Sequence, residues 1–428
     1  MLVDVRGVPA VVAMMFCAAA AGAAAGTSLL LGAVVCTLLV LLLIFLLDSS
    51  ETWVCGVSLV LCLACAVSLE QLAPFQDVVR IAAVLLLVAG VASGMLRTAK
   101  WYGRRLRPAR PLMELYLIGM TGYLLAATLP FGEARALAVG ILGLLTTAAY
   151  LLLAARYVSP RALDAALVAV LMLTVAASLV LGLVAPDVAV VGERLRGVTA
   201  NANLLGVYGL LLVATVVLRK RSWPLTSAGA VLGGAAIVWT ASRGSALSLL
   251  LALVVGAVVN AGRARRLALP VVALAAAPFF WSLRNASAAD LTLYRTNNSR
   301  EVGIREVMEL MRADSLAGLG IHNAYAANGS AVLTAFVQGG LLAICLILMI
   351  CVAFLWSSWK SGPATFALAL GVVLHSNFEP WALASMSPIS LLVALTWLSL
   401  VETGARTLPK RAAPTASSLV RHPLGSTA

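Results

Sequence analysis

The sequence is poor in charged residues. Only 11% of its 428 residues are Asp, Glu, Lys or Arg, whereas a soluble domain carries about a quarter. Acidic residues are fewer than basic ones, 17 against 30. Hydrophobic residues make up 62% of the chain. The mean hydropathy is +1.02. These values exclude a soluble domain as the main body of the chain, because so apolar a composition cannot be solvated by water.

Residues that bind metals or form disulfides are also few or badly placed. The chain has three histidines, and its outer loops, as assigned below, contain no Asp-x-Asp pair. Cys62 and Cys65 form a Cys-x-x-Cys spacing, but they lie in mid-span with no histidine nearby, which indicates core packing. We therefore predict no metal, no cofactor and no disulfide framework. All seven cysteines lie in apolar runs: Cys17, Cys36, Cys55, Cys62, Cys65, Cys345 and Cys351.

Long apolar runs dominate the chain instead. Most have the length, about 16 to 25 residues, at which a helix crosses the hydrocarbon core of a bilayer. Backbone polar groups in lipid must be satisfied within the segment, so the runs indicate helices. We predict an all-α, polytopic membrane bundle of about 12 to 14 transmembrane helices. The candidate spans are residues 8–26, 28–47, 53–69, 78–96, 112–129, 134–155, 162–185, 204–218, 225–241, 245–259, 266–283, 331–356, 363–378 and 386–402.

The first span admits a second interpretation. It is rich in alanine and ends in AAAAGAAAG, as a cleaved signal peptide would. Its positive flank is the single Arg6, and cleavage would leave the orientation of the later helices unchanged.

Positive charge is distributed unevenly among the loops. Lys and Arg near helix ends are retained on the cytoplasmic side of a membrane. Residues 97–110, RTAKWYGRRLRPAR, carry six of them and are predicted to be cytoplasmic. Alternation of the spans then puts the other strongly basic loops and the C-terminus on the same side. The net charge of +13 follows from this topology, so it does not indicate nucleic acid.

We treat residues 1–403 as a single transmembrane domain. Two outer segments stand out, residues 186–203 and residues 284–330, and long loops in compact proteins are usually functional. Within the second, SREVGIREVMELMRADS predicts an amphipathic helix that lies on the outer membrane surface or packs on the rim of the bundle. Residues 404–428 are predicted to be a disordered cytoplasmic tail.

Two arginines and a histidine lie at the predicted outer face: Arg196 and Arg243 next to helix ends, and His322 in the long outer loop just before the next span. Charged groups near a bilayer are costly unless they face a cavity or a partner, so these residues are candidates for function. Guanidinium groups offer paired planar donors that suit phosphate oxygens. An imidazole can take up or release a proton near neutral pH. Such a set suits a diphosphate leaving group and a hydroxyl nucleophile.

Each candidate also has a structural explanation. Arginines at helix ends often reach lipid phosphates or bind helix carbonyls. A His-Asn pair in a loop, here His322 and Asn323, is often part of a turn. Asn201 and Asn203 can cap the helix that begins near Leu204.

Another polar group lies near the outer end of a late helix. His375 and Asn377 either line the same cavity or hydrogen-bond to neighbouring helices. The topology also exposes Glu379 on the outer side, where a carboxylate could bind a sugar.

The order of these segments resembles the O-antigen ligase and O-antigen polymerase superfamily of bacterial membrane glycosyltransferases. The resemblance covers about residues 190–400, on the predicted outer face. It departs from the family in having Asn-Ala-Asn for Asn-Pro-Asn and a short gap before His-Asn, which leaves Arg295, Arg300 and Arg305 as competing partners of His322. The matching residues are Arg194, Gly197, Asn201, Asn203 and Gly206, then Ser242, Arg243 and Gly244, then Arg300, Gly318, Gly320, His322 and Asn323.

The resemblance implies an inverting, metal-independent transfer of a glycan from a polyprenyl diphosphate carrier to an acceptor hydroxyl. The acceptor is a glycan, a lipid or a protein, and the site faces outward from a bacterial plasma membrane. On this interpretation His322 is the general base, and Arg196 and Arg243 bind the diphosphate together with one loop arginine. The residues expected to bind substrate are Arg194, Arg295, Arg300, Arg305, Asn201, Asn203 and Asn323.

Two other functions fit many membrane spans. A transporter or flippase of lipid-linked saccharides would place polar groups near the bilayer midplane and often shows internal repeats, which we do not find in the sequence. A peptidoglycan glycosyltransferase would be expected to carry an essential acidic residue in a large outer loop. Ligase and polymerase activities are equally compatible with the motifs.

Overall fold

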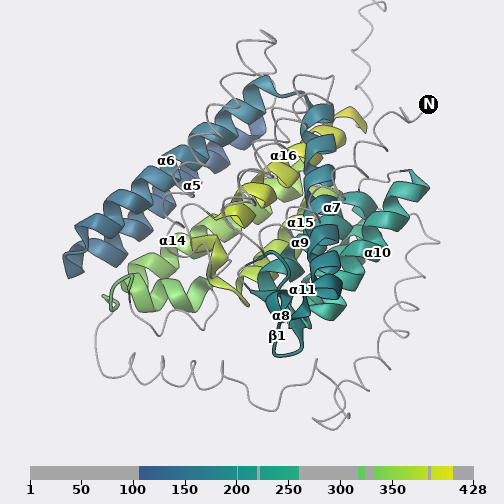
Figure 1. Cartoon of the computed structure of the whole chain (residues 1–428). Helices are drawn as coiled ribbons and strands as arrows, with labels where there is room; N and C mark the ends of the chain where they lie inside the picture. Colours follow the sequence, from purple (N-terminus) through teal and green to yellow (C-terminus); the bar gives the residue numbers. More distant parts are fainter. Residues whose placement is uncertain are drawn as a thin grey trace, which may run out of the picture.

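The computed structural model describes residues 106–199, 201–218, 222–259, 317–322, 331–383 and 387–407 (Figure 1). Helices make up 85% of this part of the chain, which is therefore all-α. Several predictions fall outside it, namely the amphipathic helix of the long outer loop and the spans at residues 8–26, 28–47, 53–69, 78–96 and 266–283.

Long helices follow one another with short links between them. Each lies on a segment for which the sequence predicts a span, so these segments are confirmed as helical. They are α5 (Leu106–Thr128), α6 (Ala134–Tyr157), α7 (Pro160–Val184), α9 (Ala202–Leu218), α10 (Trp223–Trp239), α11 (Arg243–Val259), α14 (Ala331–Ser361), α15 (Pro363–Ser376) and α16 (Pro388–Thr407). The short elements are η3 (Leu129–Phe131), α8 (Pro186–Ala189), β1 (Val190–Val191), β2 (Arg194–Leu195) and η5 (Pro380–Leu383).

Prolines and polar caps mark where several helices begin. The helices α7, α10 and α15 have proline in their first turn, where the missing N–H costs nothing. Ser159 caps α7, since its Oγ accepts a hydrogen bond from the Ala162 N–H at 3.2 Å. At the link from α5 to α6, Gly132 adopts a φ of 72° and ends η3. Local sequence therefore determines most of these boundaries.

Four of the described helices are long and apolar enough to cross a membrane: Pro111–Phe131, Ala134–Leu152, Arg161–Val184 and Ala331–Ser361. The other apolar helical segments, including Ile389–Val401 of α16, contain 10–17 residues. Large apolar side chains are exposed along the outside of the bundle, among them Leu142 at 62%, Val231 at 69% and Val352 at 65%. Such side chains fit contact with lipid. The protein thus has the character of a membrane protein, as predicted.

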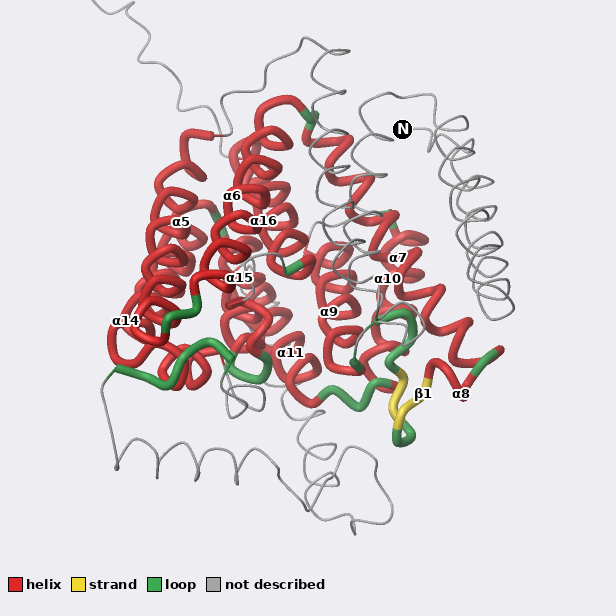
Figure 2. Tube along the Cα trace, turned by 60° about the vertical axis from the view of Figure 1, so that its left-hand side comes forward, coloured by secondary structure: helices red, strands yellow, loops and turns green. Residues whose placement is uncertain are grey.

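The helices pack in two adjoining groups. The helix α5 packs against α6 and α14, whereas α9 packs against α7, α10 and α11, and α15 and α16 lie between the two groups (Figures 1 and 2). Small residues allow close approach: a Cβ added at Gly209 of α9 would lie 2.8 Å from the Gly233 carbonyl oxygen of α10. This contact between backbones is typical of helices that pack in membranes.

Three features differ from the sequence prediction. A short hairpin lies within the predicted loop at residues 186–203. Its strands β1 and β2 have two residues each and pair antiparallel. Its turn needs positive φ at both central positions, which Gly192 (53°) and Glu193 (64°) supply. The helix α16 continues to Thr407, beyond the predicted boundary at 403. The helix α14 is kinked at Gly339–Gly340, where φ changes from −130° to 68°.

Candidate functional site

The links that carry the predicted site residues lie at one end of the bundle, called the site end below. The Arg194 guanidinium reaches the link before α11 by donating to the Thr240 carbonyl oxygen at 2.7 Å. Asn203 at the start of α9 binds Glu379, which follows α15. The hairpin and the loops of this end are visible together at the bottom of Figure 2. The site end comprises residues 129–133, 185–199, 201, 240–242, 317–322, 377–383 and 387.

The hairpin leads into a tightly packed turn. The main-chain N–H groups of Arg196 and Gly197 both donate to the Ala189 carbonyl oxygen, at 2.8 and 3.1 Å. Gly197 has a φ of 57°, and a Cβ there would lie 2.3 Å from the Ser178 Cβ. Only glycine fits such a position, because a side chain would be both strained and in collision. This contact accounts physically for the glycine of the first motif.

Arg194 and Asn203 connect four segments of the site end. Arg194 Nη2 donates to Asn203 Oδ1, and Asn203 Nδ2 donates in turn to Glu379 Oε1. All three side chains are half-buried. Together with the bond from Arg194 to Thr240, these contacts join β2, α9, the turn before α11 and the link after α15. The role of Arg194 and Asn203 in holding the loops was not foreseen, and their contact with substrate stays a prediction.

Asn201 caps α9. Its Oδ1 accepts a hydrogen bond from the Leu204 N–H at 2.9 Å. This is the structural alternative that the sequence left open for this residue. For Asn203 the capping alternative is wrong, because its side chain binds Arg194 and Glu379 instead.

Arg196 and Arg243 lie on neighbouring links of the site end. Arg196 is half-buried, and its Nε donates to the Val188 carbonyl oxygen at 3.0 Å. Within the described part of the chain its two terminal nitrogens have no hydrogen-bond partner. Arg243 is the exposed first residue of α11 and follows Ala241, whose φ is 47°. The hydrogen bond from Arg194 to Thr240 ties the two links together.

The kink of α14 holds the segment that carries His322. Because α14 is not helical at Gly339–Gly340, carbonyl groups in the preceding turn are available to other donors. The Val337 carbonyl oxygen accepts from the Leu319 N–H at 2.6 Å. The Gln338 carbonyl oxygen accepts from the Gly320 N–H at 3.0 Å. The main chain of this loop is therefore fixed against the kink.

The Gln338 side chain adds two further bonds at this place. Its Nε2 donates to the Ile321 carbonyl oxygen at 2.9 Å, and its Oε1 accepts from the Tyr123 hydroxyl of α5. Gln338 and Tyr123 are both buried. The exposed His322 follows directly after Ile321, so its backbone position is determined by these contacts.

The Gly-x-Gly motif is needed by this packing. Gly318 and Gly320 have φ values of 86° and 93°. A Cβ at Gly318 would lie 2.6 Å from the Gly340 nitrogen. A Cβ at Gly320 would lie 3.2 Å from Glu133 Oε1. The motif thus allows two backbone segments to touch.

Sequence reasoning overlooked Glu133 and ranked His375 and Glu379 low. Glu133 precedes α6 and approaches Gly320 of the loop with His322, and its Oε2 is buried with no hydrogen-bond partner in the described part of the chain. His375 is buried and binds Ser245 and Trp381. Position in a link between predicted spans was the only sequence signal for Glu133.

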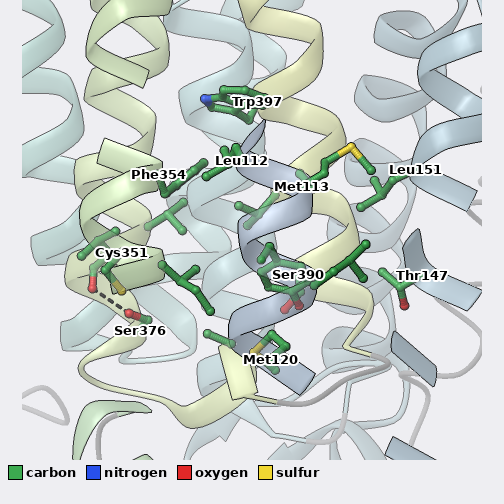
Figure 3. Close-up of a pocket in the computed structure, with 18 of the residues that line it drawn as sticks. Leu112, Met113, Met120, Thr147, Leu151, Cys351, Phe354, Ser376, Ser390 and Trp397 are labelled. Carbon is green, nitrogen blue, oxygen red and sulfur yellow. Dashed lines mark hydrogen bonds between the residues drawn. The ribbon is translucent and has the colours of Figure 1, made fainter. Parts of the chain in front are cut away.

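An apolar cavity of about 170 Å³ lies deeper in the bundle. It is lined by α5, α6, α14, α15, η5 and α16, and Figure 3 shows Leu112, Met113, Phe354 and Trp397 around it. Trp381 of η5 lines it and also donates a hydrogen bond to His375. The cavity can therefore accept hydrocarbon but offers few groups for a polar ligand.

The remaining site predictions fall outside the described residues. These are Arg295, Arg300, Arg305 and Asn323. In the described ranges no group of three His, Cys, Asp or Glu side chains could hold a metal ion. The prediction of metal independence stays a prediction.

Comparisons with known proteins add no family. A scan of the chain against models of known protein families finds no match, and a search of curated proteins finds no similar sequence.

Proposed function

We propose that this protein is a membrane glycosyltransferase that moves a glycan from a polyprenyl diphosphate carrier to an acceptor hydroxyl. The observation that carries the proposal is the position of Arg196 and Arg243 on two neighbouring links of the site end. They lie on links joined by the hydrogen bond from Arg194 to Thr240, and Arg196 has two terminal nitrogens without a partner in the described part of the chain. Two guanidinium groups on neighbouring links suit the two phosphates of such a carrier.

The arginines act on the leaving group. When the bond between the anomeric carbon and the phosphate oxygen breaks, its electron pair passes to the diphosphate. Cationic donors that are already in position stabilise this developing charge without reorganisation, which is commonly the largest contribution to catalysis. Arg196 Nε is held by the Val188 carbonyl oxygen, so the planar group is restrained before substrate arrives.

His322 acts on the nucleophile. Its imidazole takes the proton of the acceptor hydroxyl as the oxygen bonds to the anomeric carbon on the face opposite the diphosphate, and the anomeric configuration inverts. The proton then passes to solvent, since His322 is exposed. The kink of α14 restrains its backbone through Leu319 and Gly320. No metal is required by this scheme.

The membrane environment supports a lipid-linked donor. Four of the described helices are long enough to cross a bilayer, and shorter apolar helices accompany them. The proposed topology of about 12 to 14 spans also includes the apolar segments outside the described residues. The apolar cavity of about 170 Å³ can take a segment of hydrocarbon chain. Cytoplasmic placement of the basic residues 97–110 puts the site end on the outer face of a bacterial plasma membrane.

The test uses the purified protein in nanodiscs with a polyprenyl-diphosphate-linked glycan and an acceptor. We expect release of the carrier that depends on the acceptor. His322→Ala should lower the rate about 10³-fold, and Arg243→Ala should lower it about 10²-fold.

Arg161→Ala is the matched control, because Arg161 is also an exposed arginine in the first turn of a helix but lies at the opposite end of the bundle. Its rate should equal that of the unaltered protein. Equal rates for all three variants would overturn the proposal.

A flippase of lipid-linked saccharides is the second candidate. The kink at Gly339–Gly340 favours it, because transporters often build their sites from interrupted helices. Movement of the carrier across proteoliposomes without any release of the glycan would support this function over transfer.

A further inference from the structure

A chain of buried hydrogen bonds leads from α15 to the first turn of α11. His375, near the end of α15, is only 1% exposed. Its Nδ1 accepts a hydrogen bond from Trp381 Nε1 at 3.1 Å, and its Nε2 lies 3.0 Å from Ser245 Oγ. Ser245 Oγ lies 2.8 Å from Ser242 Oγ. These side chains come from three elements and meet away from solvent.

The direction of this chain follows from its first donor. An indole N–H can only donate, so His375 Nδ1 is an acceptor and the proton of the neutral imidazole resides on Nε2. Nε2 therefore donates to Ser245 Oγ, and the hydroxyls of Ser245 and Ser242 share a further hydrogen bond in which either oxygen can be the donor. A histidine in this tautomer cannot take a proton from Ser245. The pair of Ser245 and His375 is thus not a nucleophile and its base.

The two serines lie on either side of Arg243. Ser242 Oγ also accepts the Ser245 N–H at 3.4 Å, a long capping contact at the start of α11. Close packing holds the same turn from two sides. A Cβ at Gly206 of α9 would lie 2.6 Å from Ser245 Oγ, and a Cβ at Gly244 would lie 2.9 Å from Phe378.

We propose that His375 is a positioning residue for Arg243. Through Nε2–H it orients the hydroxyl of Ser245, which orients that of Ser242, and so it fixes the turn that presents Arg243 at the site end. This inference rests on the proposed function, in which Arg243 binds the diphosphate. His375 itself touches no substrate, because it is buried below the turn.

Three replacements of His375 separate its two hydrogen bonds. His375→Gln can keep a donor near the place of Nε2, His375→Asn can keep an acceptor near Nδ1, and His375→Leu keeps neither. We expect the rate of transfer to fall about 30-fold in His375→Leu and His375→Asn. In His375→Gln it should fall less than about threefold, since only this variant retains the bond to Ser245. Equal losses in Gln and Leu would contradict the proposal.

A double-mutant cycle distinguishes positioning from general support of the fold. If His375 acts through Arg243, then His375→Leu should lower the residual activity of Arg243→Ala by less than about threefold, although it lowers that of the unaltered protein about 30-fold. Equal factors in the two backgrounds would show that His375 does not act through Arg243. Thermal unfolding in detergent is measured alongside, and Ser245→Ala replaces His375→Leu in the cycle if the latter does not fold.

A labelling experiment decides the inference even if the protein transfers no glycan. Arg243→Cys is labelled with a membrane-impermeant maleimide, with the unaltered protein as background. Adding His375→Leu should change the labelling rate about tenfold, and adding His375→Gln less than about twofold. Identical rates in folded protein would overturn the positioning role. If His375→Leu changes the labelling rate but Arg243→Ala transfers glycan at the normal rate, then His375 positions residue 243 and Arg243 does not bind the diphosphate.

Discussion

Two regions of the site end are held together in different ways. The hairpin region, residues 185–199 and 201–206 with residues 240–245 and 375–379, depends on side chains: Arg194 donates to Asn203 and to the Thr240 carbonyl oxygen, and Asn203 donates to Glu379. The kink region, residues 317–322 with residues 337–340, depends mainly on the backbone, because main-chain N–H groups of the loop bind carbonyl oxygens freed by the kink of α14.

The two regions should therefore tolerate different substitutions. A side-chain contact can be rebuilt by a similar side chain, so the hairpin region should accept conservative replacements at its polar residues, although not at Gly197. A contact between two backbones leaves no room for a Cβ, so the kink region should reject even alanine at its glycines. Arg196 and Arg243 belong to the region held mainly by side chains, whereas His322 belongs to the region held mainly by backbone contacts.

Gly318→Ala should have the largest effect on stability. The new Cβ would lie 2.6 Å from the Gly340 nitrogen, and the residue has a φ of 86°. We expect the free energy of unfolding to fall by about 3 kcal/mol, from overpacking and strain together. Unfolding in detergent micelles measures it.

Gly132→Ala is the control for strain alone. Gly132 has a φ of 72°, but nothing lies within 4 Å of its Cβ position, so the loss should be about 1 kcal/mol. Equal losses for the two variants would mean that backbone contact does not hold the kink region.

Gln338→Leu should cost about 2 kcal/mol, because it leaves the Tyr123 hydroxyl and the Ile321 carbonyl oxygen without their partner. Hydrogen exchange at residues 319–321 should accelerate as well. Combining it with Tyr123→Phe should restore part of the loss, since removing both polar partners is less costly than removing one. No recovery in the double variant would show that the two side chains are not energetically coupled.

Asn203→Leu should cost about 1.5 kcal/mol, less than the change at Gln338 because the partners Arg194 and Glu379 are only half-buried and water can reach them. Asn377→Ala is the matched control, since among the described residues the side chain of this exposed Asn binds only the Val373 carbonyl oxygen of the helix that it follows. A larger loss at Asn377 than at Asn203 would argue against a side-chain tie in the hairpin region.

Asn201→Ala should have the smallest effect, about 1 kcal/mol, because it removes the cap of α9. Asn201→Ser should restore most of it, as serine caps helices nearly as well. Thermal unfolding of the two variants measures the difference. Equal unfolding of Asn201→Ala and the unaltered protein would show that the cap contributes nothing.

Much of the helical fold could be predicted because its causes are local. An apolar run of sufficient length forms a helix in lipid. A proline such as Pro363 is favoured at the first position of a helix, so it marks where the helix begins. The hairpin at Gly192 and Glu193 escaped prediction, because glutamate rarely adopts the positive φ of 64° that this turn requires. The kink at Gly339–Gly340 escaped it too, because two glycines also occur in straight membrane helices.

Of the candidate site, the sequence could name residue types and their order but not their partners. Gly197, Gly206 and Gly318 were noticed as motif residues, and the structure supplies the close contacts that require them. His375 and Glu379 were ranked low, since nothing near them in sequence indicates what they bind.

Local patterns are enough to predict the all-α membrane character, the positions of the described helices and the candidate cationic residues, because these depend on hydrophobicity and charge within short segments. Which residues meet depends on the tertiary structure. Arg194 binds a carbonyl oxygen 46 positions away, Ser245 binds a histidine 130 positions away, and Asn203 binds a carboxylate 176 positions away. Such contacts arise from the packing of whole helices, which no local pattern encodes.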